Sequence, residues 1–414
     1  MDEQLYDTLD VVSDGLRVQL EYQPRANYSL VLSGIPFIRA VVIHNESGVE
    51  LPSIQVAARL AVPGSTQSVV WTRQIAGPHA PDSVSRLDRQ ADFIEFLPLL
   101  ADAVESAPAS LELRARSAAI PGVEPRLVAT LQIGAYNEFH NWPGFHASLA
   151  AFVQPNTHSV TTILRTASDH LLEQTGDGAL QGYQAGPERA HQIGAAIYEA
   201  LRARRITYIN PPASFERTGQ KVRTTGQVLA DHFGTCIDLA VLYAACVEAA
   251  GLFPLIFICR NHAFGGFYVE EITGETPTVT QPNSLVNLVE LGLIAPVELT
   301  GLNPGSSVDF REARRIGAEY IQRRLDLVST MIDIARSRID GIRPMPHFTS
   351  SGEPAPDERE IAEERPFVTV GSLQNLSRER QEEEQVRGVL DARDESPARF
   401  RNWKRDLLDL SLRN

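Results

Sequence analysis

The sequence predicts an α+β protein in which an antiparallel β-sandwich precedes a domain of helices packed on an antiparallel sheet. Two patterns lead to this expectation. Apolar residues alternate with polar ones in short segments before residue 134, whereas from about residue 140 they recur every three or four positions. A chain of 414 residues has room for two domains, and a hydrophobic content of 43% can supply sizeable cores.

Residues 1–137 are expected to form the β-sandwich, and an immunoglobulin-like arrangement is our interpretation of it. The alternation is clearest in three segments, at residues 16–22, 54–60 and 127–133. The segment 89–100 fits either a strand or a short helix. The two histidines of residues 1–137, His44 and His79, are isolated in turn-like contexts, so this domain offers no candidate for catalysis.

Residues 138–346 are expected to form the second domain. Apolar spacing predicts helices at 160–174 and at 187–204, the latter beginning at Pro187, where the fixed φ of proline suits a first helical position. Further along, the pattern predicts strands at 252–259, 263–272 and 293–300 and amphipathic helices at 310–324 and 329–340. Residues 347–398 are rich in charge and poor in large apolar side chains, which is typical of a flexible linker.

Composition narrows the classes of function. The net charge of −14 and the lack of a dominant basic stripe argue against nucleic-acid binding by this chain. No apolar run approaches the roughly 20 residues that span a bilayer, and the acidic start M-D-E-Q-L-Y-D is unlike a secretory signal. We therefore expect a cytoplasmic protein without a membrane partner.

Cys236 is the first candidate for chemistry, because it follows Gly234 and Thr235 at the predicted start of an apolar helix. Thr235 and Asp238 match a T-x-x-D capping box, which would fix the first turn. A thiol in that turn lies at the positive end of the helix dipole, which favours a thiolate nucleophile. Asp238 is assigned to the cap rather than to catalysis, because it lies on the helix of the nucleophile.

Three further residues complete the candidate site. His262 precedes the strand that returns from this helix, where it can serve as the base for Cys236. Glu298 lies in an apolar strand, where a carboxylate needs a partner; His262 is the natural one, although another partner is an alternative. Gln220, in a loop before the helix, is either an amide donor to an oxyanion or an ordinary loop residue.

The other two cysteines, Cys246 and Cys259, are interpreted as core residues. Neither a C-x-x-C motif nor paired histidines at ligand spacing occur in the sequence, so a zinc site is not expected. The chemistry proposed for Cys236 requires no metal and no organic cofactor.

The stretch from Gly234 to Glu270 resembles the core of the transglutaminase-like superfamily, whose members use a Cys–His–Asp triad in papain-like geometry. The resemblance implies Cys236 as nucleophile, His262 as base and Glu298 as orienting acid. This sequence departs from the superfamily in two ways. It has H-A-F at 262–264 where H-A-W is usual, and its third member is Glu rather than Asp.

Flanking segments at 210–223 and 332–346 are similar to those of bacterial multidomain helicase–nuclease proteins associated with defence against mobile DNA. Residues 399–414 resemble the start of the domain that precedes the helicase there, and the chain ends within this motif. The resemblance implies a helicase or nuclease partner in the same or a longer polypeptide, an antiphage effector or regulatory role, and a protein or peptide substrate.

The sequence thus predicts a cysteine-dependent acyl hydrolase, specifically a protease that acts through a thioester. Transamidation to a lysine uses the same chemistry and stays open. The alternative from another class is a catalytically inactive protein-interaction or sensor module, which the phenylalanine after His262 favours.

Overall fold

The computed structural model describes residues 6–62, 69–88, 95–142, 144–210 and 219–346. The expected linker at 347–398 and the expected start of a further domain at 399–414 lie outside these ranges. Contacts divide the chain into a first unit (1–152, 212–222 and 341–350) and a second unit (153–211, 223–340 and 351–414). Residues 138–152, which the sequence analysis assigns to the second domain, thus group with the first unit.

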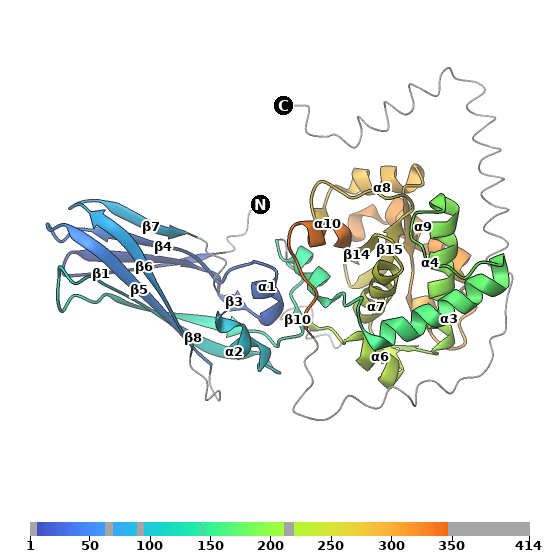
Figure 1. Ribbon diagram of the computed structural model, residues 1–414, viewed down its shortest axis with the longest axis horizontal. Helices are drawn as coiled ribbons and strands as arrows, with labels where there is room; N and C mark the ends of the chain where they lie inside the picture. The colour runs from blue at the N-terminus through green and yellow to red at the C-terminus, as the bar shows by residue number, and fades with distance from the viewer. Residues whose placement is uncertain (1–5, 63–68, 89–94, 143, 211–218, 347–414) are drawn as a thin grey trace, which may run out of the picture. The chain divides into compact units, whose positions relative to one another are not determined.

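The first unit contains two β-sheets (Figure 1). The four-stranded sheet has the order β1-β2-β4-β7, formed by Asp7–Ser13, Leu16–Tyr22, Ile38–Asn45 and Val84–Asp88. The five-stranded sheet has the order β3-β9-β8-β5-β6, formed by Arg25–Ala26, Arg126–Ile133, Ala107–Arg116, Leu51–Ala61 and Val69–His79. Of these pairings only β3 with β9 is parallel, so the antiparallel β-structure predicted for this region is confirmed.

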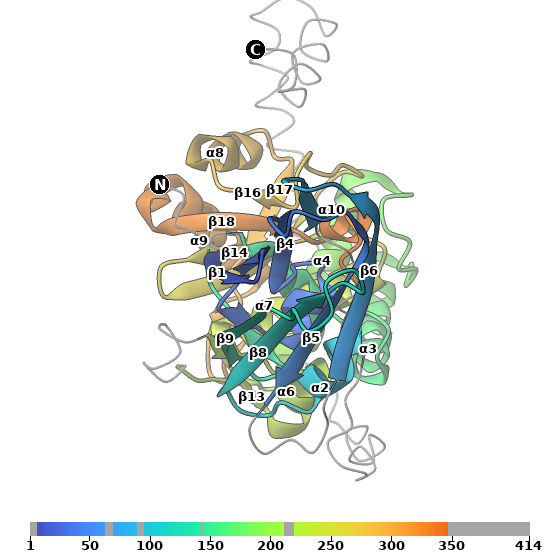
Figure 2. The same cartoon turned by 90° about the vertical axis from the view of Figure 1, so that its left-hand side faces the viewer.

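Alternation along the strands explains the core of this unit. In β2 every second residue, from Leu16 to Tyr22, is buried, and β9 follows the same pattern. Figure 2 shows β9, β8, β5 and β6 side by side in the order of their sheet. The remaining elements are short: α1 (Tyr28–Leu32), α2 (Leu97–Ala101), β10 (Glu138–Phe139), η2 (His146–Phe152) and β12 (Gln220–Lys221). The ambiguous segment 89–100 therefore ends in a helix.

The second unit is built from helices around one antiparallel sheet, which confirms the α+β class. Its helices are α3 (His158–Thr175), α4 (Gly186–Ala203), α6 (Thr225–Asp231), α7 (Cys236–Ala249), α8 (Pro282–Glu290), α9 (Phe310–Arg323) and α10 (Ile334–Ile339), with short 3₁₀ turns η3 (Thr300–Leu302) and η4 (Leu325–Leu327). The helices predicted at 160–174, 187–204 and 310–324 are present. In the described part of the chain, no helix has both the length and the apolar character that crossing a membrane requires.

The sheet of this unit has the order β16-β18-β14-β15-β17. Its strands are Thr278–Val279, Val328–Asp333, Pro254–Cys259, His262–Tyr268 and Ile294–Val297. All neighbouring pairs are antiparallel. A separate parallel pair joins β11 (Thr207–Tyr208) to β13 (Phe233–Gly234), directly before α7.

The helix predicted at 329–340 is wrong in its first half. Residues 328–333 form β18, and only the residues from Ile334 onward are helical. The strand lies between β14 and β16, and Thr330, Met331, Ile332 and Asp333 are all buried, so no polar face marks it as a strand. Asp333 then caps α10 by accepting a hydrogen bond from the backbone of Arg336 (2.8 Å).

Helix α7 lies across β14 and β15, with α3, α4 and α6 also packed against it (Figure 1). Every residue from Cys236 to Val247 is buried, which explains why the sequence of α7 is apolar all round. The opposite side of the sheet carries a cluster that includes Phe257, Phe264 and Met331 with Leu285 of α8 and Ile321 of α9. The start of α7 is therefore held by packing on several sides.

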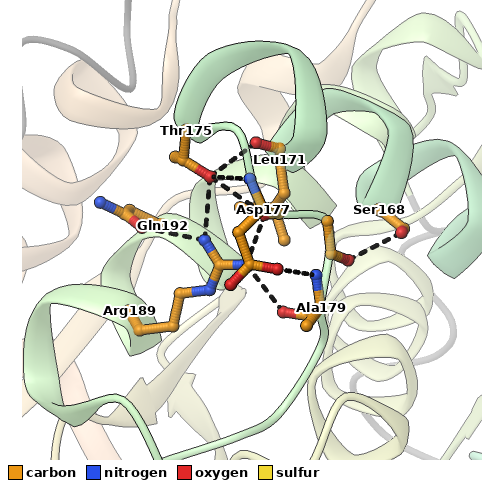
Figure 3. Close-up of polar contacts among 8 residues, drawn as sticks. Ser168, Leu171, Thr175, Asp177, Ala179, Arg189 and Gln192 are labelled. Atoms are coloured by element: carbon orange, nitrogen blue, oxygen red, sulfur yellow. Dashed lines mark hydrogen bonds and ion pairs between the residues drawn. The ribbon is translucent and has the colours of Figure 1, made fainter.

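A buried arginine fixes the connection between α3 and α4, as Figure 3 shows. Arg189 is 5% exposed and donates to the carbonyl oxygens of Asp177 (2.6 Å) and Ala179 (2.9 Å) and to the Thr175 hydroxyl (3.1 Å). Ser168 donates to the carbonyl of Gly178 (2.7 Å) from the other side. Each peptide oxygen thus gains a partner, so this cluster is explained by its structural role.

Candidate active site

Cys236 is the first residue of α7, and a buried carboxylate fixes the turn that presents it. Thr235 and Asp238 form the predicted capping box. The Asp238 carboxylate accepts hydrogen bonds from the backbone of Thr235 (2.9 Å) and from the backbone (2.8 Å) and guanidinium (2.9 Å) of Arg223. Asp238 is fully buried, and these donors offset the cost of burying its charge. The assignment of Asp238 to the cap is therefore supported by its contacts.

His262 is the first residue of β15, and a tight hairpin places it. Cys259, the last residue of β14, pairs with His262 across a two-residue connection. Asn261 in this connection has φ of 61°, a left-handed conformation that asparagine tolerates better than most residues. Because β14 and β15 both pack against α7, the hairpin returns the imidazole to the region of that helix.

Glu298 directly follows β17 and orients His262. Its Oε2 lies 2.7 Å from Nε2 of His262. Its Oε1 accepts hydrogen bonds from the backbone N–H (2.8 Å) and the hydroxyl (2.7 Å) of Thr300. The backbone N–H of Glu298 donates to the carbonyl of Ala313 in α9 (3.0 Å). With both oxygens engaged and the backbone tethered, the carboxylate has a defined orientation toward the imidazole.

The electrostatics of this pair favour the imidazolium form. Burial lowers the pKa of His262, but hydrogen bonds to Cys236 and Glu298 and the charges of both groups more than offset this effect and raise it to about 10. Burial likewise opposes the charge of Glu298, yet hydrogen bonds from His262 and Thr300 hold its pKa below the usual value. The two groups thus stabilise each other's charged form.

Cys236 and Glu298 both influence the imidazole. Nε2 donates to Glu298, which leaves Nδ1 as the other ring nitrogen, and Cys236 lies close enough to raise the pKa of His262. Thiol, imidazole and carboxylate thus form one group of neighbouring side chains, in which Cys236 is 5% exposed. Such a group can move a proton from sulfur to nitrogen while the carboxylate stabilises the resulting cation.

Aromatic rings support the imidazole. Phe264 is fully buried and stacks on Phe257 with ring centroids 4.8 Å apart. Its ring centroid lies 6.0 Å from that of His262, and Tyr320 of α9 lies 5.6 Å from the same imidazole. Phenylalanine therefore fills a core position beside His262 and leaves the contact of His262 with Glu298 in place.

Tyr208 is a residue of this site that the sequence analysis missed. It lies on β11, opposite Gly234 of β13, and its side chain lies close enough to Cys236 for that residue to affect its pKa. Its backbone N–H donates to Oδ1 of Asn303 (3.1 Å). Burial, followed by the charges of Cys236 and Glu298, raises the pKa of Tyr208, so its hydroxyl keeps its proton at neutral pH.

The remaining candidates are Gln220 and the other two cysteines. Gln220 pairs with Phe139 in the first unit, and its role as an oxyanion donor stays a prediction. Cys246 and Cys259 are buried, and burial raises the pKa of both thiols, that of Cys259 to about 12. Among the residues that the structure describes, no three histidine, cysteine, aspartate or glutamate side chains form a group that could hold a metal ion.

Comparisons with known proteins add little. No protein family and no characterised protein matches the sequence. Among solved structures, an Arabidopsis thaliana protein determined in solution is 10% identical over 34% of this chain and 83% of its own, with a TM-score of 0.17. The beta-glucuronidase 2 of Bacteroides uniformis is 6% identical over 46% of this chain and 25% of its own, with a TM-score of 0.14. Likenesses this weak carry no argument about fold or function.

Proposed function

We propose that this chain is a cysteine-dependent acyl hydrolase, specifically a protease, with Cys236 as nucleophile, His262 as acid and base, and Glu298 as orienting acid. The observation that carries the proposal is that the imidazole of His262 is hydrogen-bonded to the Glu298 carboxylate, at 2.7 Å, and lies close enough to Cys236 for that residue to raise its pKa. A cysteine that only fills the core would need neither a histidine nor a carboxylate beside it. This interpretation also agrees with the sequence resemblance to transglutaminase-like proteins.

The proposed reaction has two halves. His262 takes the thiol proton, and the Cys236 thiolate attacks the carbonyl carbon of an amide, which forms a C–S bond. The tetrahedral intermediate then breaks its C–N bond as His262 gives the proton to the leaving amine, which leaves a thioester on Cys236. In the second half His262 takes a proton from water, the resulting hydroxide attacks the thioester, and the acid product leaves as the thiol is restored.

One backbone donor and one side-chain donor are suited to stabilise the oxyanion of the tetrahedral intermediate. The backbone N–H of Cys236 lies in the first turn of α7, where it has no partner within the helix. The Tyr208 hydroxyl, which lies near Cys236, is a second donor in the same unit. Gln220 stays the candidate that the sequence predicts for the same role. An amine in place of water would turn the same thioester into a transamidation product.

The association with a helicase–nuclease module and a role in defence against mobile DNA are part of the proposal as well. They rest on the sequence resemblance of the segments at 210–223, 332–346 and 399–414. We also propose an immunoglobulin-like arrangement for the first unit, because this unit contains short antiparallel strands in two sheets.

Labelling of the three thiols tests the proposal. Iodoacetamide at pH 6, followed by mass spectrometry of the folded protein, is expected to modify Cys236 well before Cys246 and Cys259, whose buried thiols stay protonated. The variant His262→Ala should remove this selectivity. Equal and slow modification of all three thiols in the wild type would instead identify the chain as an inactive interaction or sensor module.

Proteolysis is tested by comparing new protein N-termini in a bacterial lysate after incubation with wild type or with Cys236→Ala. We expect termini that depend on Cys236 and that persist with the matched control Cys246→Ala, which removes a thiol from the same helix. Identical sets of termini from wild type and Cys236→Ala would contradict the protease assignment.

A further inference from the structure

A cavity of about 580 Å³ adjoins the acid end of the proposed triad. Glu298 and Tyr320 form part of its wall, and the Tyr320 ring lies 5.6 Å from the imidazole of His262. This volume falls within the roughly 300–1,000 Å³ typical of ligand sites and exceeds what a single ion or water needs. The cavity can therefore hold a segment of a peptide next to the reacting groups.

The acidic groups on the wall are already neutralised. Glu298 accepts from His262 and Thr300, as described above. Glu319 forms ion pairs with Arg315 at 2.6 Å and with Arg323 at 3.7 Å. Neither carboxylate is left to attract a cation into the cavity, because each has a positive partner close by.

The two arginines on the wall of the cavity differ in whether they have an ion-pair partner. Arg323 is committed to Glu319, whereas Arg324 has no ion pair with any residue in the described parts of the chain. Its guanidinium lies 5.7 Å from the centre of the Tyr320 ring, which is the ring that contacts His262. The charge that the cavity can offer a ligand is therefore positive. It is carried by Arg324, the residue that directly follows α9.

The other lining groups suit a carboxylate on a short apolar stem. Ser306 accepts a hydrogen bond from the backbone N–H of Val308 (3.2 Å), so its own hydroxyl proton can be donated to a ligand. Val308 and Ile316 provide apolar wall for methylene groups. A glutamate side chain combines these features, whereas a lysine would meet Arg324 without a counter-charge.

We propose that this cavity is a substrate subsite that accepts an acidic side chain, preferably glutamate, with Arg324 and Ser306 as its carboxylate ligands. The inference deepens the proposed function and rests on it, because the subsite is defined by its place beside Glu298 and His262. It assigns the protease a preference for acidic segments of its protein substrates.

The test uses the full chain and epoxysuccinyl peptides that extend to both sides of the electrophilic carbon. Each probe carries Glu, Gln or Lys at one position on an otherwise uncharged background, and mass spectrometry follows the rate of Cys236 alkylation. At the position that occupies the cavity, we expect the Glu probe to react about tenfold faster than the Gln probe, the order expected for a charge-assisted hydrogen bond. The Lys probe should be slowest.

Variants identify the residue responsible. Arg324→Gln should bring the Glu and Gln rates within about threefold of each other, and Arg324→Glu should reverse the preference in favour of the Lys probe. The matched control is Arg165→Gln, which removes an exposed arginine of α3 outside the cavity and should keep the wild-type preference. Thermal melts establish that each variant is folded.

The outcomes separate the two proposals. If Cys236 reacts faster than Cys246 and Cys259 with every probe, but Glu, Gln and Lys probes react alike at all positions, the subsite is refuted while the protease assignment stands. If no peptide probe alkylates Cys236 selectively, the proposed function itself fails. A preference for Glu that survives in both Arg324 variants would also overturn the assignment of Arg324.

Discussion

Nε2 of His262 lies 2.7 Å from Oε2 of Glu298, and this contact determines how the imidazole is oriented and charged. The other carboxylate oxygen is held by Thr300, so Glu298 cannot rotate away without losing two further hydrogen bonds. A buried carboxylate thus holds one nitrogen of the imidazole in place. That arrangement is costly for a purely structural histidine and useful for one that exchanges protons with a thiol.

Glu298→Gln should therefore slow the alkylation of Cys236 at pH 6. An amide in place of the carboxylate no longer stabilises the imidazolium, so His262 loses the charge that favours a thiolate beside it. We expect a rate about tenfold or more below wild type, measured by iodoacetamide labelling and mass spectrometry. Glu298→Asp keeps the charge and should retain more of the rate, and equal rates in wild type and Glu298→Gln would contradict an orienting role.

The stability of the protein should depend on pH through the same pair. The pKa of His262 is raised from 6.5 to about 10, so its contribution is fully present below pH 6.5 and is lost as pH rises toward 10. The pKa of Glu298 is lowered, so its contribution is present above its ordinary value of 4.5 and is lost as pH falls. Both contributions are present together between about pH 4.5 and 6.5.

Urea unfolding of wild type and Glu298→Gln measures this effect. The difference in free energy of unfolding should reach about 2 kcal/mol between pH 5 and 6.5, a value below the full cost of breaking a buried ion pair because the amide can still form hydrogen bonds. It should decrease as pH approaches 10. A difference that is constant from pH 5 to 10 would show that the pair does not exchange protons with the unfolded state as described.

Local sequence was sufficient to predict one half of the site and not the other. The capping box at Thr235 and Asp238 follows from four consecutive residues, and the helix after it follows from composition. The pairing of Glu298 with His262 follows from the cost of burying an unpaired carboxylate. Each of these inferences needed only a short segment or a single electrostatic rule.

The parts that were missed depend on contacts between distant segments. Tyr208 reaches Cys236 because β11 pairs in parallel with β13, and two-residue strands have no period that a sequence can display. The sequence of the strand β18 predicts a helix, because the strand is buried on both faces between β14 and β16 and lacks an alternating pattern. The position of Gln220 in the first unit follows from its pairing with Phe139, which no local pattern indicates.

Tyr208→Phe should raise the pH at which half of Cys236 is alkylated. The phenol lies near Cys236 and keeps its own proton, because its pKa is raised, so it can donate a hydrogen bond to the thiolate. Removing a donor to a charged group should move the midpoint upward by about one pH unit, since a hydrogen bond to a charged group contributes about 1.5 kcal/mol. The matched control is Tyr320→Phe, which contacts His262 through its ring and should leave the midpoint unchanged. Overlapping profiles for Tyr208→Phe and wild type would exclude a bond to the thiolate.

Asp238→Asn should destabilise the fold while leaving the chemistry of the folded molecules nearly intact. The buried carboxylate accepts from Thr235 and Arg223, and an amide cannot accept all of these donors, so we expect a loss of about 3 kcal/mol in urea unfolding. The second unit contains a matched control, because Thr224 and Gln227 form another capping box at the start of α6. Gln227→Ala should cost less than about 1 kcal/mol, since that box is exposed. Folded Asp238→Asn should alkylate Cys236 within a few-fold of the wild-type rate, whereas a large loss of rate at unchanged stability would move Asp238 from the cap into the catalytic machinery.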